Sequence, residues 1–360
     1  LGVMTLASIL GFAVSRHLGL TQRMLATQET GTGAMGQIST LLKAVIATSL
    51  TMEALLAIMF LPRFLAMGID PVHAVWDAVF MAISVFNNAG FVILPEGLSP
   101  HVTDWWMLIP IILGTTVGAI GFPVIMDVAK NLRSPRRWRL HTKLTLATYL
   151  ILAFVGALAL ALTEWHNPAT LGSIDTPSKI LNAMLAGVNS RSSGLSALDV
   201  GSMQTQTHFV QDILMMIGGG SASTAGGVKV TTFAVLVLAV IAEARGDRDI
   251  ETFGRRIPTS TVRLAVAVSL LGLAMVAISV VLLLSLTDHS LDVILFETVS
   301  AFATVGLSTG VTPTLPVGAK YVLIALMFAG RTGSMTVAAA LALRERSRVI
   351  RMPEEQPIIG

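Results

Sequence analysis

The chain has 360 residues, of which 53% are hydrophobic and only 12% are charged. Because charged residues make up about 25% of an average soluble domain, this composition argues against a soluble enzyme or binding module. The sequence has no cysteine, which excludes disulfides and thiolate metal sites. The net charge of +3 does not require a nucleic-acid partner, because the basic residues lie in loops that a membrane topology explains.

Apolar runs of about 20 residues are long enough to span a bilayer. After an opening apolar run at 1–14, further runs lie at 41–62, 104–129, 144–163, 209–242, 262–286 and 319–343. These runs predict an all-α polytopic membrane protein. The chain opens inside a hydrophobic segment, without an initiator methionine or a charged leader, so we expect that a further segment precedes it.

The distribution of charge predicts which loops face the cytoplasm. Of the 24 Lys and Arg residues, 18 lie at 16–43, 130–143, 245–263 and in the tail from Arg344. The positive-inside rule places these loops in the cytoplasm of a multi-pass protein of the cell membrane. The remaining connections, at 67–104, 164–212 and 287–318, hold 11 acidic residues and only Lys179 and Arg191 as bases. They should face outward, where acidic groups attract cations.

Each outer connection contains a stretch too short to span a bilayer, followed by a turn with a glycine. In chain order the segments are "VWDAVFMAISVFNNAGF", "SKILNAMLAGVNSRSSGL" and "VILFETVSAFATVGLSTG". Their glycines, Gly90, Gly194 and Gly306, are 104 and 112 residues apart, and each lies between two apolar runs. The sequence therefore predicts an internal repeat of span, half-helix, glycine turn and span.

Such a repeat has a chemical meaning. The C-terminus of a half-helix carries partial negative charge, and irregular backbone at membrane depth is tolerated only where it is buried or lines a cavity. Glycine permits successive carbonyls to point the same way, as in a potassium filter. The predicted ion filter consists of Asn88, Ala89, Gly90, Ser192, Ser193, Gly194, Thr304, Val305 and Gly306. The alternative is a set of ordinary outer turns.

The segment "GGGSASTAGGVKVTT" interrupts the run 209–242. A helix of about 34 residues would be ~51 Å long, which exceeds the ~30 Å core of a bilayer. A phosphate-binding loop is excluded because Lys229 follows Val228 instead of glycine and because apolar runs flank the segment. We expect a non-helical break that lines a pathway, and close packing of helices by small residues is the alternative.

Several motifs resemble those of the Trk/Ktr/HKT superfamily of potassium transporters, most closely the Ktr-type membrane subunit. They are "SVFNNAGF", "NSRSSGL", "AFATVGLS", the basic loop "GDRDIETFGRRIP" and the opening "LGVMTLASILGFAVSRHLGLTQRMLATQE". The resemblance covers essentially the whole chain. The family more often has Arg-Thr-Ala-Gly-Phe in the third filter, so Ser192, Ser193 and Leu195 are mild departures.

The resemblance implies pseudo-fourfold span–pore-loop–span repeats, as in potassium channels, with the first repeat incomplete. Residues 1–40 would hold the second span of repeat 1 and a cytoplasmic loop. Repeat 2 would be 41–140, repeat 3 with a broken second span 141–258, repeat 4 259–345, and the cytoplasmic tail 346–360.

The resemblance also implies that the break is an intramembrane gate loop below the filter. An arginine in the last span would lie near it and add a positive barrier. The predicted gate residues are Gly218, Gly219, Gly220, Ser221, Ser223, Thr224, Gly226, Gly227, Lys229 and Arg331. The alternative for Arg331 is a structural ion pair, for example with Asp127 or Glu53.

The implied function is potassium uptake, with potassium as the substrate ion at the filter carbonyls, sodium as a candidate activator and no cofactor in this chain. The implied partners are a second copy of the chain, a cytoplasmic ring of nucleotide-binding regulatory subunits and the lipid bilayer. An enzyme is not expected, because the sequence lacks His-Glu-x-x-His and has no Gly-x-Ser-x-Gly at a strand-to-helix turn. A broken-helix secondary transporter for another cation or a small solute is the alternative.

Three further residues have roles that the sequence leaves open, and a pair of tryptophans has one. Glu297 could hold neighbouring backbone or add charge near the mouth. Arg191 could donate hydrogen bonds to filter carbonyls or face solvent. Lys229 could reach the cytoplasm or contact a subunit. Trp106, with the tryptophan before it, is interpreted as an interfacial anchor.

Overall fold

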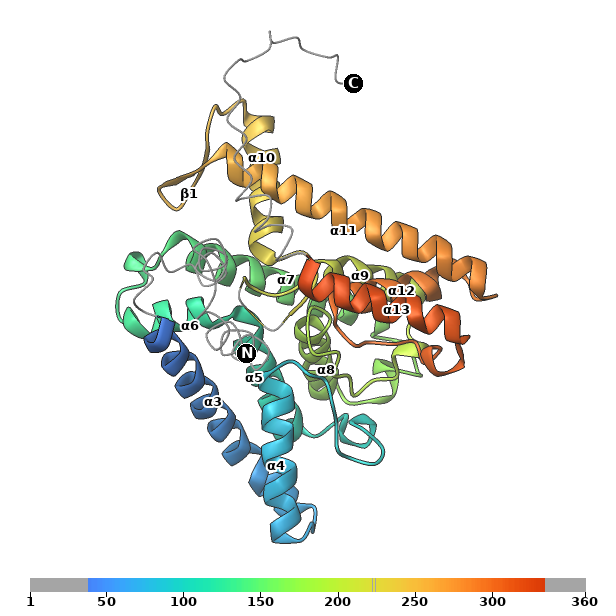
Figure 1. Ribbon diagram of the computed structural model, residues 1–360. Coiled ribbons are helices and arrows are strands. Elements are labelled where there is room, and N and C mark those ends of the chain that lie inside the picture. The colour runs from blue at the N-terminus through green and yellow to red at the C-terminus, as the bar shows by residue number, and fades with distance from the viewer. Residues whose placement is uncertain (1–37, 222, 224, 334–360) are drawn as a thin grey trace, which may run out of the picture.

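The computed structural model describes residues 38–221, 223 and 225–333. The opening run 1–14, the predicted tail 346–360 and the predicted gate residue Thr224 lie outside the described residues. The described chain is mostly helical, its two named strands form one small hairpin, and it follows the predicted order of span, half-helix and span (Figure 1).

Three units of this kind follow one another. The first is α3 (Ile38–Ala66), α4 (Pro71–Phe86) and α5 (Trp105–Ile120), the second α7 (Leu140–Glu164), α8 (Thr176–Asn189) and α9 (Thr205–Met216), and the third α11 (Thr259–Leu286), α12 (Leu291–Ala303) and α13 (Val317–Phe328). Two helices, α6 (Phe122–Lys130) and α10 (Val230–Arg245), continue the second spans of the first two units, and a π-helical turn, Ala329–Gly333, follows α13. Short 3-10 turns lie at Ser99–His101, Pro135–Arg137, Leu171–Ser173, Val200–Ser202 and Thr312–Thr314.

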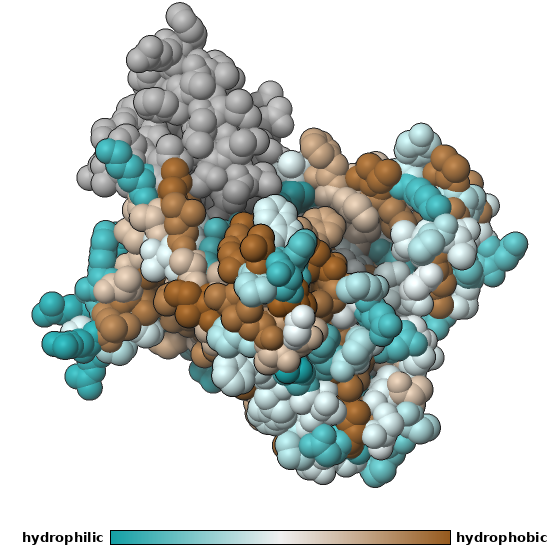
Figure 2. All heavy atoms as spheres, turned by 90° about the horizontal axis from the view of Figure 1, so that it is seen from below, coloured by the Kyte–Doolittle hydropathy of each residue, from teal (hydrophilic) through white to brown (hydrophobic). Residues whose placement is uncertain are grey.

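The first helix of each unit fits a membrane span. Among the described residues, α3, α7 and α11 are each long and apolar enough to cross a bilayer, and the bent pair of α5 and α6 makes a fourth if it counts as one span. Large apolar side chains on these helices are exposed, and apolar side chains also reach the face drawn in Figure 2. Examples are Leu55, Ile58, Ile151, Phe154, Leu270 and Val281.

The middle helix of each unit, which we call the half-helix, is too short to span. Half-helices α4, α8 and α12 have 16, 14 and 13 residues. At 1.5 Å per residue they are roughly 20 to 24 Å long, against a hydrocarbon core of about 30 Å. Asp70 caps α4 by accepting from the N–H of Val72, and Asp175 caps α8 by accepting from the N–H of Ser178. Hydrogen bonding from Ser178 lowers the pKa of the Asp175 carboxyl, so this N-terminus carries the negative charge that suits it.

The units pack in a repeated way. The second span of one unit lies against the half-helix of the next: α5 contacts α8, and α9 contacts α12. Within the second unit, α7 and α8 cross closely at Gly187. A methyl group there would lie 2.6 Å from the backbone nitrogen of Ala157 and would collide with the carbonyl of Ala153. Glycine at this crossing therefore permits backbone contact.

The prediction of one continuous span at 104–129 is wrong. The helix breaks at Gly121, where φ is 95°, and α5 and α6 are bent by 95° relative to each other. Pro123 explains the break, because it has no N–H to pair with the carbonyl of Ala119 and its ring disfavours a helical residue before it. The sequence signal was the Gly-Phe-Pro at residues 121–123.

The basic loop before the third unit forms a hairpin. Strands β1 (Ile250–Thr252) and β2 (Arg255–Ile257) pair antiparallel, and Phe253 and Gly254 at the turn both have positive φ. Arg256 pairs with Asp249 at 2.8 Å. The hairpin lies beside the far end of α10, away from the half-helices (Figure 1).

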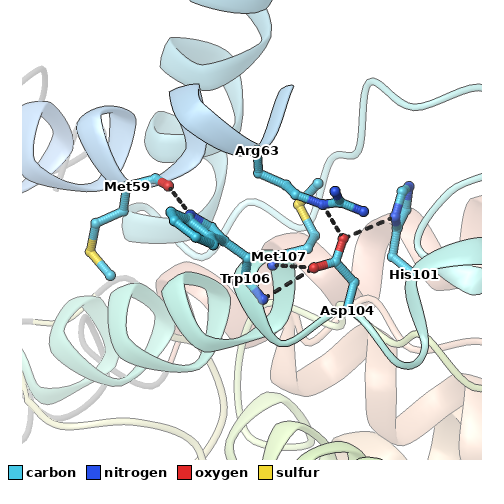
Figure 3. A network of polar contacts seen from close by, with 6 residues as sticks. All are labelled: Met59, Arg63, His101, Asp104, Trp106 and Met107. Carbon is cyan, nitrogen blue, oxygen red and sulfur yellow. Dashed lines mark hydrogen bonds and ion pairs between the residues drawn. The ribbon is translucent and has the colours of Figure 1, made fainter. Parts of the chain in front are cut away.

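A polar network joins the two spans of the first unit at the N-terminus of α5 (Figure 3). Asp104 accepts from the backbone N–H groups of Trp106 and Met107 at 3.1 and 3.2 Å, and from Nε of Arg63 at 2.5 Å. The indole N–H of Trp106 donates to the carbonyl of Met59 at 3.0 Å. Trp106 stays 59% exposed, which suits its interpretation as an interfacial anchor.

The crossing of α7 and α8 gives a test of the fold. Gly187→Ala should lower the free energy of unfolding by about 1–3 kcal/mol, because the added methyl has no room and the helices must separate. Thermal unfolding of the purified protein in detergent measures this. Gly318→Ala is the matched control, since the nearest atom to a methyl at that position is Cδ1 of Leu286 at 3.8 Å. Equal stability of the two variants would contradict the close crossing.

Candidate functional site

The three predicted glycine turns lie against one another. We call them the Gly90 turn (87–91), the Gly194 turn (190–195) and the Gly306 turn (303–307). A methyl group on Gly90 would collide with the carbonyl of Ser193, and one on Gly194 would lie 2.5 Å from the carbonyl oxygen of Val305. The Gly194 turn is therefore the middle one, in contact with both of the others.

Each turn directly follows the C-terminus of a half-helix. The helices α4, α8 and α12 end at Phe86, Asn189 and Ala303. The C-terminus of a helix carries about half a negative charge, spread over its unpaired carbonyls. Three such ends meet where the turns meet, which favours a cation at this place.

The turns share left-handed backbone. The angle φ is positive at Asn88 (51°), Gly90 (76°), Ser193 (83°), Gly194 (62°), Thr304 (52°) and Gly306 (96°). Left-handed conformations at residues other than glycine cost roughly 1–3 kcal/mol and concentrate at functional sites. In the Gly90 and Gly306 turns the two left-handed residues are separated by one ordinary residue, whereas in the Gly194 turn they are adjacent.

The hydrogen bonds of the Gly306 turn fix the direction of its carbonyls. The N–H groups of residues 304–306 all donate to the end of α12, to the carbonyl of Ala301 (3.1 Å) and to the carbonyl (3.0 Å) and hydroxyl (3.2 Å) of Ser300. In a trans peptide the C=O points opposite to the N–H. The carbonyls of residues 303–305 therefore point away from α12 as a row.

The other two turns repeat this arrangement. The N–H groups of residues 88–89 donate to the last turn of α4 at 3.1 and 2.8 Å, and those of residues 191–192 donate to the last turn of α8 at 3.4 and 3.2 Å. By the same argument the carbonyls of residues 87–88 and 190–191 point away from their half-helices.

Hydroxyl groups add to the polar character of this place. The side-chain oxygens of Ser192, Ser193 and Thr304 are buried and have no hydrogen-bond partner within the part of the chain that the structure describes. Buried polar atoms in proteins nearly always have a partner, so these oxygens are available to an ion or to water. They belong to the same turns as the carbonyl rows, and oxygen ligands of this kind suit a hard cation.

The run 209–242 is broken as predicted. Helix α9 ends at Met216 and α10 begins at Val230, and we call the non-helical segment between them, 217–229, the glycine loop. Hydrogen bonds close its neck: the N–H of Gly218 donates to the carbonyl of Val228 at 2.8 Å, and the N–H of Val230 donates to the carbonyl of Gly219 at 3.1 Å.

One side of the glycine loop touches the Gly306 turn. A methyl group on Gly226 would lie 2.8 Å from the carbonyl oxygen of Ala303 and would collide with the hydroxyl of Thr304. Gly227 lies against the side chain of Ala303 in the same way. Because Ala303 supplies the first carbonyl of the row, the loop lies at the helix end of the row.

The other side of the glycine loop touches the break between α5 and α6. The N–H of Gly220 donates to the carbonyl of Ala119 at 2.8 Å, and a methyl group on Gly219 would lie 2.6 Å from the same oxygen. This carbonyl is available because Pro123 cannot donate to it. The two breaks in the helices are therefore bonded to each other, a contact that the sequence did not predict.

Lys229 and Arg331 also lie at the loop. The ammonium of Lys229 donates to the carbonyl of Ala225, so it folds back onto the loop. Its contact with a second subunit stays a prediction. Arg331 belongs to the π-helical turn, where Gly330 lies against the backbone of Phe302 at the end of α12.

The carboxylates considered as partners of Arg331 have other donors. Glu53 accepts from the amide of Asn87 at 2.8 Å. Asp127 accepts from the hydroxyl of Thr142 at 2.7 Å and from the N–H of Arg139 at 2.9 Å. Glu53 thereby tethers the first span α3 to the start of the Gly90 turn.

Both alternatives considered for Arg191 are wrong. Its side chain is fully buried, and none of its guanidinium nitrogens has a hydrogen-bond partner among the described residues. The guanidinium instead stacks on the ring of Tyr149 in α7, 3.6 Å from the ring centre. A cation–π contact of this kind stabilises a desolvated guanidinium without a carbonyl acceptor.

The structure supports the first alternative for Glu297, which is 4% exposed. One carboxylate oxygen accepts from the hydroxyl of Ser308 (2.8 Å) and from the N–H (2.8 Å) and hydroxyl (2.9 Å) of Thr309. The other accepts from the hydroxyl of Thr312 at 2.5 Å. Glu297 thus holds the backbone that follows the Gly306 turn.

Sequence comparison finds similar proteins along the whole chain. Residues 1–350 match the TrkH family, which is described as a cation transport protein. The chain is 36% identical over 360 residues to the Ktr system potassium uptake protein B of Bacillus subtilis, and 33% identical over 362 residues to that of Vibrio alginolyticus. These matches cover 100% of this chain in both cases, and 80% and 79% of the relatives. The potassium/sodium uptake protein NtpJ of Enterococcus hirae is 30% identical, with 98% of this chain and 79% of that protein covered.

A solved structure shares the fold. The crystal structure of the potassium transporter TrkH from Vibrio parahaemolyticus aligns with a TM-score of 0.68 at 17% identity, covering 90% of this chain and 68% of that chain. This likeness confirms the predicted class of all-α membrane fold.

Glu297 gives a test that separates its two proposed roles. Glu297→Gln should lower the free energy of unfolding by about 1–3 kcal/mol, because an amide nitrogen would face donors that now share a carboxylate. Thermal unfolding in detergent measures this, with Glu251→Gln on the exposed hairpin as the control. If Glu297 only supplied charge to a mouth, cation uptake would fall while stability stayed at the wild-type value.

Proposed function

The chain belongs to the TrkH family of cation transport proteins, and we propose that it takes up potassium ions across the cell membrane through a filter of backbone carbonyls. As a member of this family with several long apolar helices, it is an integral membrane protein. One observation carries the proposal. Three turns adjoin one another, and the N–H groups of each turn donate to the half-helix before it. The carbonyls of each turn therefore form a row that points away from that half-helix.

The physical basis of the proposed filter is replacement of the hydration shell. An ion that enters must lose water, and a set of carbonyl dipoles held in advance compensates for that loss. The partial negative charge at the ends of α4, α8 and α12 adds to the attraction. The hydroxyls of Ser192, Ser193 and Thr304 are further oxygen ligands at the same place. The relatives named as potassium uptake proteins support potassium as the substrate ion.

We propose that the glycine loop is the gate. It lies against the carbonyl of Ala303, so an ion that leaves the row at this end meets the loop. The positive charge of Arg331 raises the electrostatic barrier there. Opening requires the loop to leave the Gly306 turn, and its hydrogen bond to Ala119 couples that movement to the break between α5 and α6.

The remaining proposals concern sodium and partners. The relative named as a potassium/sodium uptake protein supports sodium as an activating ion, which is tested by measuring potassium uptake with and without sodium. We propose a homodimer that binds a cytoplasmic ring of nucleotide-binding regulatory subunits. The hairpin offers a docking surface, because Phe253, Arg255 and Arg256 are all exposed on it.

The central test is potassium flux into liposomes that contain the protein. The wild type should conduct potassium down its own gradient and discriminate against sodium. Gly306→Ser should weaken this discrimination, because φ of 96° at Gly306 strains any residue with a side chain. The nearest atom to a methyl there is 3.9 Å away, so the effect comes from the backbone angle. The permeability ratio of potassium to sodium measures it.

Gly318→Ala serves as the control. Gly318 does not have a positive φ, and the position has room for a methyl group. An unchanged permeability ratio in substitutions of Gly90, Gly194 and Gly306 would reject the filter. Uptake that requires a second, coupled solute would favour the broken-helix secondary transporter instead.

The gate proposal is tested at Arg331. Arg331→Ala should raise the maximal potassium flux with little change in the permeability ratio, because the arginine acts on the barrier beyond the filter. Deleting part of 218–227 should also raise the flux. If both changes act on one barrier, the double variant should gain less than the product of the two effects.

Flux must be expressed per folded transporter in liposomes. A structural ion pair predicts a different result, because removal of Arg331 would leave a buried acid unpaired and lower stability. Unchanged or lower flux together with reduced thermal stability would therefore reject the gate role.

A further inference from the structure

We propose that Ser84, Asn189 and Ser300 are positioning residues, which fix the far end of each carbonyl row and thereby set its selectivity. All three lie in the last turns of the half-helices, and each side chain bonds to the glycine turn that follows its own helix. The inference rests on the proposed filter, because it assigns the residues that hold the filter in shape.

The three residues make equivalent hydrogen bonds. In each turn the acceptor is the carbonyl of the residue that directly follows the glycine. The hydroxyl of Ser84 donates to Phe91 at 2.7 Å, the amide of Asn189 donates to Leu195 at 2.7 Å, and the hydroxyl of Ser300 donates to Leu307 at 2.6 Å.

The three donor side chains are buried, and the bonds to Leu195 and Leu307 are fully buried, whereas the bond to Phe91 is partly buried. Ser84, Asn189 and Ser300 are 4%, 1% and 3% exposed. A buried carbonyl that loses its donor keeps the cost of desolvation without compensation. The carbonyl after each glycine is therefore held toward its half-helix, while the carbonyls before the glycine point away from it.

Ser300 makes the arrangement clearest, because its hydroxyl bonds on both sides of the glycine. It accepts from the N–H of Gly306 at 3.2 Å and donates to the carbonyl of Leu307. The N–H bond directs the carbonyl of Val305 away from α12, since the two groups share one trans peptide. One hydroxyl thus determines which carbonyl faces the ion and which faces the protein.

This control matters because glycine alone does not fix the peptide that follows it. Glycine occupies left- and right-handed regions about equally, so the backbone on either side of Gly306 could turn if the N–H of Gly306 and the carbonyl of Leu307 lost their bonds to Ser300. Rotation would change the number and positions of the oxygens that face the ion, on which selectivity depends. The polar side chains behind the glycines remove this freedom.

Ser300→Ala is the decisive variant. It removes both bonds, and the permeability ratio of potassium to sodium in liposomes should fall roughly fivefold or more, the factor expected for one lost hydrogen bond. Thr298→Val is the matched control. Thr298 lies in the same half-helix and is fully buried, but its hydroxyl donates to the carbonyl of Ile294 at 2.6 Å within the helix. Its permeability ratio should stay at the wild-type value.

Asn189→Asp provides a second variant of nearly the same shape. It replaces the donor by a carboxylate oxygen that repels the carbonyl of Leu195, so the ratio should again fall. If Ser300→Ala does not fold, Ser84→Ala tests the same bond in the Gly90 turn. Thermal unfolding is measured alongside, because a purely structural role would lower stability and leave the ratio unchanged.

The outcomes are separable from those of the proposed function. A wild type that does not select potassium would reject the filter itself. A selective wild type whose ratio persists in Ser300→Ala, Ser84→Ala and Asn189→Asp would overturn the positioning role and leave the filter intact. A ratio that falls equally in Thr298→Val would also overturn it, because the effect would then belong to any hydroxyl in α12.

Discussion

The interaction on which the structure depends is the return of the turn N–H groups to the half-helices. In a bilayer every backbone polar group needs a partner within the protein or in a watery cavity. The N–H groups of residues 88–89, 191–192 and 304–306 find theirs at the helix ends. The carbonyls of the same peptides point the other way, and a cation is a suitable partner for them. A half-helix shorter than a span would place its turn at membrane depth, which is where the proposed filter requires it.

The second constraint is that a broken helix leaves carbonyls to be satisfied. At the break after α5, Pro123 leaves the carbonyl of Ala119 without its helical donor, and the N–H of Gly220 takes that place. The glycine loop is thus bonded to one break and packed under the Gly306 turn on its other side. The loop needs glycine at both contacts, because the backbone of the neighbouring segment occupies the space that a side chain on the loop would fill.

The sequence predicted the repeat, the half-helices and the break in the run 209–242. Glycine spacing and the length of apolar runs indicate directly where helices begin and end. The sequence did not predict contacts between units. The break at Gly121 was missed although Pro123 signals it, since apolar composition continues across it. The burial of Arg191 depends on Tyr149, 42 positions earlier in the chain, which no local pattern connects to it. Ser300 could have been found, because residues 84–90 and 300–306 share the pattern Ser-x-Phe-x-x-x-Gly.

The Gly194 turn lacks the Ser-x-Phe-x-x-x-Gly pattern, yet it has the same hydrogen bond to the carbonyl after the glycine. The bond behind the glycine spans seven positions from Ser84 and from Ser300, but six from Asn189. The shorter turn places its left-handed residues next to each other, at Ser193 and Gly194. Serine does occur one position later, yet the hydroxyl of Ser190 bonds back to its own helix. The longer amide of Asn189 reaches the carbonyl after the glycine, so a different side chain preserves the same restraint on the backbone.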